Sequence, residues 1–337
     1  MVADEETCNT REARFLLPLT SVQHRIATLV AEKLAALEDF SSPAGPGAKT
    51  TMLGIPFRYL LKHPLAAMEL VADPLQTWTM VVDNYRALQE RKEPIRSYDW
   101  DPEWEQKLHR QLGLDWPCSC SGECAALYPQ VLAELEESGV RPGPESFAVW
   151  NDGDAALIRA VWCIIRHTRP EKVIETGVAH GVTSRMVLEA MQRNQRGQLW
   201  SIDLPPLEQE LRDRVGIAVH GPIARRWSYV RGSSRLRLPA LLSQVGRIDL
   251  FIHDSLHSER NVRFELDLAW SALNEGGSIV VDDVDANSGF RLFRAAFPDQ
   301  PAMVCQAEPV RPDLRRFNER GLFGVILKSK STVRSAA

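Results

Sequence analysis

The second half of the chain repeats one pattern. A short run of β-branched or aliphatic residues ends at a polar position and is followed by an amphipathic segment. Strands that alternate with helices pair in parallel, because each crossover helix returns the chain to the same end of the sheet. We therefore expect an α/β fold with a doubly wound sheet whose site lies at the carboxyl ends of the strands. The expected strands are 172–177, 198–203, 227–232, 247–254 and 278–283, the last after a turn at Gly276 and Gly277.

The region before these strands has a different character. Apolar residues recur at helical spacing over 12–39 and 56–91, and a stretch rich in Pro and Gly follows at 138–146. The 337 residues also match two domains of about 150 residues each. We expect residues 1–150 to form a mostly helical cap or oligomerisation region, 151–330 a cofactor-binding domain and 331–337 a tail. Two further runs, 302–308 and 322–329, are expected to close the sheet.

Composition narrows the class of partner. The chain is 44% hydrophobic and 25% charged with a net charge of −4, which excludes collagen-like and mainly disordered proteins. It has no general attraction for nucleic acids or anionic membranes, so its local basic runs are expected to be solvated helix faces. No stretch is long and apolar enough to span a membrane. Six cysteines without a secretory signal favour a cytoplasmic location, and we expect a small-molecule acceptor.

The first expected strand leads into a glycine-bearing loop. Gly177 and Gly181 allow close approach of a ligand to the backbone, and the next helix would offer its free N–H groups. The spacing G-x-x-x-G departs from the G-x-G-x-x-G fingerprint, which disfavours a nicotinamide dehydrogenase. Asp203 ends the second strand, where a carboxylate can accept hydrogen bonds from ribose hydroxyls. The alternative is a turn that serves only helix packing.

Taken together, VIETGVAHGVTS, WSIDLP, DLFIHDSLHS and LNEGGSIVVDDV resemble the class I S-adenosylmethionine-dependent methyltransferases. The resemblance covers about residues 150–330 and implies a Rossmann-like, seven-stranded sheet with S-adenosylmethionine as cofactor. The loop would hold the methionine part, Asp203 the ribose, and 232–234 would lie near the adenine. Ala179 stands where many relatives have a glycine. The cofactor residues implied are Glu175, Thr176, Gly177, Gly181, Ser184, Asp203, Gly232, Ser233, Ser234 and Asp254.

A second group of residues is acidic. Asp254 ends the fourth strand, and Asp282 and Asp283 end the fifth, so neighbouring strands bring three carboxylates to one edge. Carboxylates in such a cluster repel one another unless a cation or protons compensate them, and oxygen ligands suit Mg²⁺. The arrangement resembles metal-dependent O-methyltransferases of the catechol type and those that act on sugars. Alternatively, Asp282 caps the next segment and Asp254 contacts only the cofactor.

Two histidines compete for the role of general base. His257 follows Asp254 by three positions, where the catechol type has a basic residue. His253 neighbours Asp254 on the strand and should point to the opposite side, so we favour His257. His257 could also be an ordinary surface histidine. Asn287 either contributes to the metal or substrate shell or serves as a turn residue.

The expected function is therefore metal-assisted O-methylation of a small hydroxylated molecule or a sugar, with the acceptor undetermined. The alternatives are a metal-independent methyltransferase and a cofactor-binding protein that has lost catalysis and acts as an assembly module. The helical N-terminal region could form a homo-oligomer.

Three cysteines lie outside this interpretation. Cys118, Cys120 and Cys124, with His109 upstream, contain enough ligands for zinc. Their spacing differs from the paired C-x₂-C form of common zinc modules, which favours free thiols.

Overall fold

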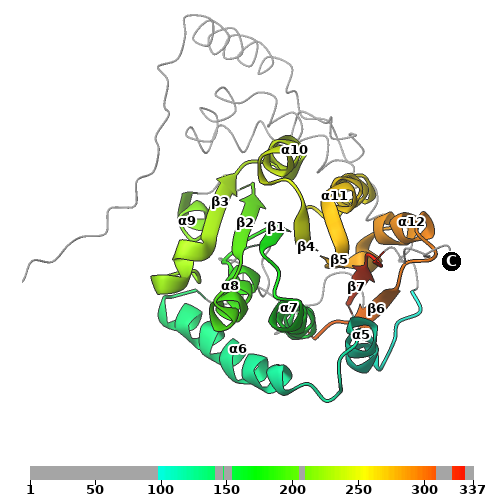
Figure 1. The fold of residues 1–337 in the computed structure, drawn as a ribbon. Helices are drawn as coiled ribbons and strands as arrows, with labels where there is room; N and C mark the ends of the chain where they lie inside the picture. Colours follow the sequence, from blue (N-terminus) through cyan, green and yellow to red (C-terminus); the bar gives the residue numbers. More distant parts are fainter. Residues whose placement is uncertain (1–97, 141–146, 148–153, 205–208, 309–320, 331–337) are drawn as a thin grey trace, which may run out of the picture. The chain divides into compact units, whose positions relative to one another are not determined.

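The computed structural model describes residues 98–140, 147, 154–204, 209–308 and 321–330 (Figure 1). The helices expected in 12–39 and 56–91, and the tail, lie outside these residues. The helices are α5 (Trp104–Leu112), α6 (Ser119–Glu137), α7 (Ala155–Thr168), α8 (Val182–Asn194), α9 (Gln209–Arg212), α10 (Ser234–Val245), α11 (Glu259–Ala272) and α12 (Gly289–Ala295). The strands are β1 (Lys172–Thr176), β2 (Gln198–Asp203), β3 (Trp227–Arg231), β4 (Ile248–His253), β5 (Leu273–Val281), β6 (Ala302–Gln306) and β7 (Leu322–Leu327).

The strands form one seven-stranded sheet in the order β3-β2-β1-β4-β5-β7-β6. Strands β1 to β5 pair in parallel, whereas β7 lies antiparallel between β5 and β6. The doubly wound α/β fold expected from the sequence is therefore confirmed, as is the closing pair of strands.

The turn expected at Gly276 and Gly277 is wrong. Both glycines lie inside β5, which starts directly after α11. The pairing of β4 with β5 shifts at this point, because Ile248 pairs with Leu273 and Leu250 already pairs with Ser278. Gly276 has φ +81°, so the glycines accommodate a bulge in the strand rather than a reversal of the chain.

Helices cover both faces of the sheet (Figure 1). Successive strand residues point to opposite faces, so Leu250 and Ile252 join the core beneath α6, α7 and α8, whereas Phe251 joins the core beneath α10, α11 and α12. Most strand positions are buried, as expected for parallel strands covered on both sides.

Helices α5 and α6 precede the methyltransferase-like pattern but share the first of these cores. Trp104 of α5 is 6% exposed and packs edge-on against Phe323 of β7, with 5.2 Å between ring centroids. Asp101 forms a bridge to Cys305 of β6. The described residues 98–140 thus pack with the sheet, while the cap or oligomerisation role of residues 1–150 stays a prediction.

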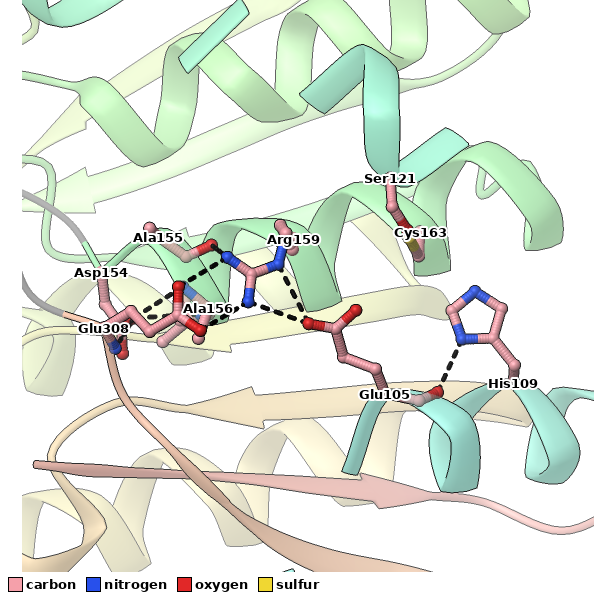
Figure 2. A network of polar contacts seen from close by, with 10 residues as sticks. Glu105, His109, Ser121, Asp154, Ala155, Ala156, Arg159, Cys163 and Glu308 are labelled. Carbon is pink, nitrogen blue, oxygen red and sulfur yellow. Dashed lines mark hydrogen bonds and ion pairs between the residues drawn. The ribbon is translucent and has the colours of Figure 1, made fainter. Parts of the chain in front are cut away.

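An ion-pair network joins α5, α7 and the segment after β6 (Figure 2). The guanidinium of Arg159 donates to Glu105 and makes two hydrogen bonds of 2.8 Å to the carboxylate of Glu308. Asp154 caps α7 by accepting from Ala156 N–H and also accepts from Glu308 N–H. Burial raises the pKa of Asp154 to about 6. The network fixes α5 against the start of α7.

If α5 is part of the domain core, Trp104→Ala should lower the free energy of unfolding by about 3–5 kcal/mol, because it leaves a large cavity beside Phe323. Denaturant unfolding measures the loss. Leu292→Ala, at a position 40% exposed, is the control and should change stability by less than 1 kcal/mol. Equal effects of the two substitutions would contradict the shared core.

Candidate functional site

The backbones of three strand ends meet at Gly177. Its N–H donates to the carbonyl of Ile202, and the N–H of Asp254 donates to the carbonyl of Thr176. Gly177 has φ +87°, and a Cβ placed on it would lie 1.8 Å from the carbonyl oxygen of Asp254. Only glycine fits here, because any side chain would push β1 and β4 apart.

The loop then runs from Gly177 to the first turn of α8. Gly181 is left-handed at φ +84°, and Ala179 is left-handed at φ 49° without being glycine. This conformation is the physical reason why a glycine suits the position of Ala179. The N–H of Ala179 donates to the carboxylate of Asp203 at 3.2 Å, so the acid that ends β2 orients the loop. The first N–H groups of α8 are the kind of donors that bind polar ligands.

Glu175 lies beneath this loop and is fully buried. Its Oε2 accepts hydrogen bonds from Ser184 and Ser201 at 2.5 and 2.6 Å. Its Oε1 has no partner among the described residues. Burial raises the pKa of Glu175 to about 7, against the lowering effect of the two hydroxyls. A cation that reached Oε1 would therefore stabilise the charged carboxylate strongly.

The remaining cofactor candidates lie at the ends of β1, β2 and β3. Gly232 N–H donates to the carbonyl of Asp203, which brings the turn after β3 beside the acid of β2. Ser233 precedes α10, and Ser234 opens it. The hydroxyl of Thr176 donates to Glu265, so this side chain belongs to a buried network.

Glu265 of α11 was not identified from the sequence. It is fully buried, and its carboxylate accepts hydrogen bonds from Thr176, Ser255 and Asn261 and contacts Nδ1 of His253 at 2.7 Å. Burial opposes its ionisation, but the charge and hydrogen bond of His253, together with the hydroxyls, lower its pKa to about 2. Glutamate in an amphipathic helix is usually solvated, so no pattern in the sequence singled it out.

The acidic residues converge at the carboxyl ends of β4 and β5. Ligand atoms of Asp254, His257 and Asp282 all lie within 4.8 Å of one another. Nε2 of His257 lies 3.8 Å from Asp254, and its Nδ1 lies 3.6 Å from Asp283. Burial and the charges of Asp283 and Asp254 raise the pKa of Asp282 well above its ordinary value. The neighbouring carboxylates thus oppose the ionisation of Asp282.

These residues fit a divalent cation by donor chemistry and by proximity. Carboxylate oxygens such as those of Asp254 and Asp282 are ligands that Mg²⁺, Mn²⁺ or related ions accept. Asp254 and Asp282 lie in the close group, whereas Asp283 lies 3.6 Å from Nδ1 of His257. A cation among these groups would favour the charged form of Asp282, whose pKa burial and the neighbouring carboxylates raise.

The two candidate bases occupy different surroundings. His253 is fully buried and bound to Glu265, whereas His257 lies among the three aspartates. Strand alternation predicted that His253 and Asp254 would face apart, and the contacts agree. Asn287 uses its side-chain oxygen to accept from Gly289 N–H, as a turn residue does.

Residues 174–284 match the family model described as a methyltransferase domain. These residues, which contribute strands to the seven-stranded sheet, are therefore similar to a methyltransferase domain. The match includes the glycine-bearing loop and the acids that end β2, β4 and β5.

The chain is similar in form to several solved structures. Cofactor-bound Rv0187 from MTB is 17% identical, with 70% of this chain and 100% of that chain covered and a TM-score of 0.44. The O-methyltransferase TomG from Streptomyces achromogenes, involved in tomaymycin synthesis and solved with S-adenosylmethionine, is 16% identical, with coverages of 68% and 100% and a TM-score of 0.43. An O-methyltransferase from Bacillus cereus in complex with S-adenosylhomocysteine is 12% identical, with coverages of 66% and 97% and a TM-score of 0.43. Similarity at these sequence identities and TM-scores does not identify the acceptor.

The comparison with curated proteins gives no match. Within the part of the chain that the structure describes, none of the helices has the length and apolar character needed to cross a membrane.

The raised pKa of Glu175 predicts a pH dependence of stability. The unfolded chain loses this proton near pH 4.5 and the folded chain near pH 7, so folding loses up to about 3 kcal/mol as pH rises through that window. Glu175→Gln removes this contribution. The unfolding free energy of wild type minus that of Glu175→Gln, measured without cofactor, should therefore fall between pH 5 and pH 8. The exposed Glu137→Gln is the control, and parallel curves for wild type and Glu175→Gln would contradict the assignment.

Proposed function

We propose that the protein is an S-adenosylmethionine-dependent O-methyltransferase that uses a divalent cation and acts on a small hydroxylated molecule or a sugar. The observation that carries the proposal is the group of Asp254, His257 and Asp282, which adjoins the glycine loop through the contact between Gly177 and Asp254. Direct transfer of a methyl group requires the donor site and the acceptor site to be adjacent, as the glycine loop and the acidic group are.

The cofactor would occupy the edge formed by β1, β2 and β3. Its methionine part would lie along 177–184, with its ammonium group toward Oε1 of Glu175, where a buried acceptor atom lacks a partner among the described residues. Asp203 would accept from the ribose, and 232–234 would adjoin the adenine. Ser184 acts through Glu175, since its hydroxyl orients the carboxylate.

Asp254 and Asp282 would hold the cation, with Asp283 close behind them. A bound divalent ion lowers the pKa of an acceptor hydroxyl and fixes its position. The three carboxylates would disfavour an anionic acceptor beside them unless a cation is present.

His257 is proposed to take the proton from the acceptor hydroxyl. Its two ring nitrogens face Asp254 and Asp283, and these carboxylates stabilise the imidazolium that forms. His253 is unsuited to this role because it is buried and bound to Glu265.

A metal-independent transferase is the second candidate. The observation that favours it is the proximity of Asp282 and Asp254, since a proton shared by two carboxylates relieves their repulsion as a cation would. In that case His257 would work alone. A cofactor-binding assembly module, the remaining alternative, would bind S-adenosylmethionine without turnover.

Cytoplasmic location and self-association through the N-terminal region are part of the proposal. Six cysteines in 337 residues and a helical pattern in 12–39 and 56–91 support them.

Asp254→Asn should lower kcat by about 100-fold or more with a panel of catechols and sugars, because it removes a charge from the cation site. The cofactor loop stays intact, so binding of S-adenosylhomocysteine, measured by calorimetry, should change little. EDTA should abolish the activity of the wild type, and addition of Mg²⁺ should restore that activity. Asp299→Asn, an exposed change, is the control. Full turnover after complete metal removal would eliminate metal assistance while leaving the methyltransferase proposal in place.

His257→Ala should lower kcat by about 10²–10⁴-fold and abolish the acid limb of the pH–rate profile, since that limb reports the general base. KM for S-adenosylmethionine should be unaffected. His220→Ala, whose side chain is 60% exposed, should keep the wild-type profile. If His257→Ala kept the acid limb of the pH–rate profile, another residue would have to be the general base.

A further inference from the structure

A second cluster of metal-binding side chains lies away from the carboxyl edge of the sheet. Ligand atoms of His109, Cys118 and His167 all lie within 4.8 Å of one another. Sγ of Cys118 is 3.0 Å from Nε2 of His167 and 4.0 Å from Sγ of Cys163. These residues come from three helices, since His109 is on α5, Cys118 caps α6, and Cys163 and His167 are on α7.

His109 is oriented as a metal ligand. It is 1% exposed, and its Nδ1 lies 2.7 Å from the carbonyl oxygen of Glu105. A carbonyl oxygen only accepts, so Nδ1 carries the hydrogen and Nε2 of the neutral ring has a free lone pair. Nε2 is buried and has no hydrogen-bond partner among the described residues. In Figure 2 it points away from Glu105, on the side where Cys163 lies. Imidazole ligands of metals often donate their other N–H in this way.

We propose that His109, Cys118, His167 and Cys163 bind a structural zinc ion. Tetrahedral zinc with Zn–S bonds of about 2.3 Å separates two sulfur ligands by about 3.8 Å, close to the 4.0 Å between Cys118 and Cys163. Cys163 and His167 are four residues apart on α7 and so share one face of the helix. Two thiolates balance the charge of Zn²⁺, which suits a buried position.

The proposed zinc ligands differ from the group considered in the sequence, which was Cys118, Cys120 and Cys124 with His109. All four cysteines of this region belong to the hydrophobic core, and the close group of ligand atoms contains His109, Cys118 and His167. Cys163 is included as the fourth ligand because its Sγ lies 4.0 Å from that of Cys118. Zinc bound by the proposed set would clamp α5 and the start of α6 to α7, which leads directly into β1. The clamp is independent of the proposed catalytic function.

The test uses the full chain, purified with zinc and dialysed against Mg²⁺. Elemental analysis should find one zinc per chain in the wild type and a loss of zinc in both Cys118→Ser and His167→Ala. Cys120→Ser is the matched control for removal of a thiol, and Asp254→Asn excludes zinc held by the acidic cluster. Both should retain zinc. The Co²⁺-loaded wild type should show thiolate-to-cobalt charge transfer that Cys118→Ser weakens.

A measurement on the wild type alone covers variants that fail to fold. Zinc should protect Cys118 and Cys163 from alkylation, as read by peptide mass spectrometry, and chelation should expose them. Failure of the folded chain to retain zinc, or retention by folded Cys118→Ser and His167→Ala, would overturn the proposal. If a reductant, rather than a chelator, removed the protection from alkylation, the proposal would also be overturned, because that result would reveal a Cys118–Cys163 disulfide.

Discussion

One buried carboxylate holds the carboxyl edge of the sheet together. Glu265 projects from α11 and binds Thr176 at the end of β1, His253 at the end of β4 and Ser255 in the following loop. Its pKa of about 2 means that the charge persists under ordinary conditions despite complete burial. Removing one partner would leave that charge undercompensated, which costs several kcal/mol in comparable sites, about 3–5. The positions of the reactive groups depend on this network.

The same edge contains a second carboxylate whose pKa moves in the opposite direction. Burial and the charges of Asp283 and Asp254 raise the pKa of Asp282, whereas the charge of His253 and the hydrogen bonds from its neighbours lower the pKa of Glu265 against the effect of burial. His253 and Asp254 are adjacent on the chain, and strand alternation sends one to Glu265 and the other to Asp282. The sheet thus separates Glu265, whose charged form is stabilised, from Asp282, whose ionisation is opposed. A cation or a transferred proton would stabilise the second group, which is why the proposed chemistry is assigned to it.

Local patterns predicted the sheet and its acids because they are local properties. Apolar runs mark buried strands, and the carboxyl ends of parallel strands meet at one edge, so Asp203, Asp254 and Asp282 could be placed together from the sequence. The bulge at Gly276 was missed because a glycine pair also suits a turn. Glu265 and the pair of His109 with His167 were missed because packing between distant helices defines them. Their spacing along the chain carries no signal.

The two candidate metal sites also differ in what they require of the protein. The acidic cluster offers hard carboxylate oxygens, which hold Mg²⁺ weakly and exchange it readily. The cluster on α5, α6 and α7 offers sulfur and nitrogen, which retain zinc and reject Mg²⁺. Ligand softness therefore keeps Mg²⁺ out of the second cluster, whereas the ion at the acidic cluster depends on which divalent metal is available. A chain that folds around zinc on one side of the sheet can still exchange Mg²⁺ at the carboxyl edge, so stability and turnover would depend on different metals.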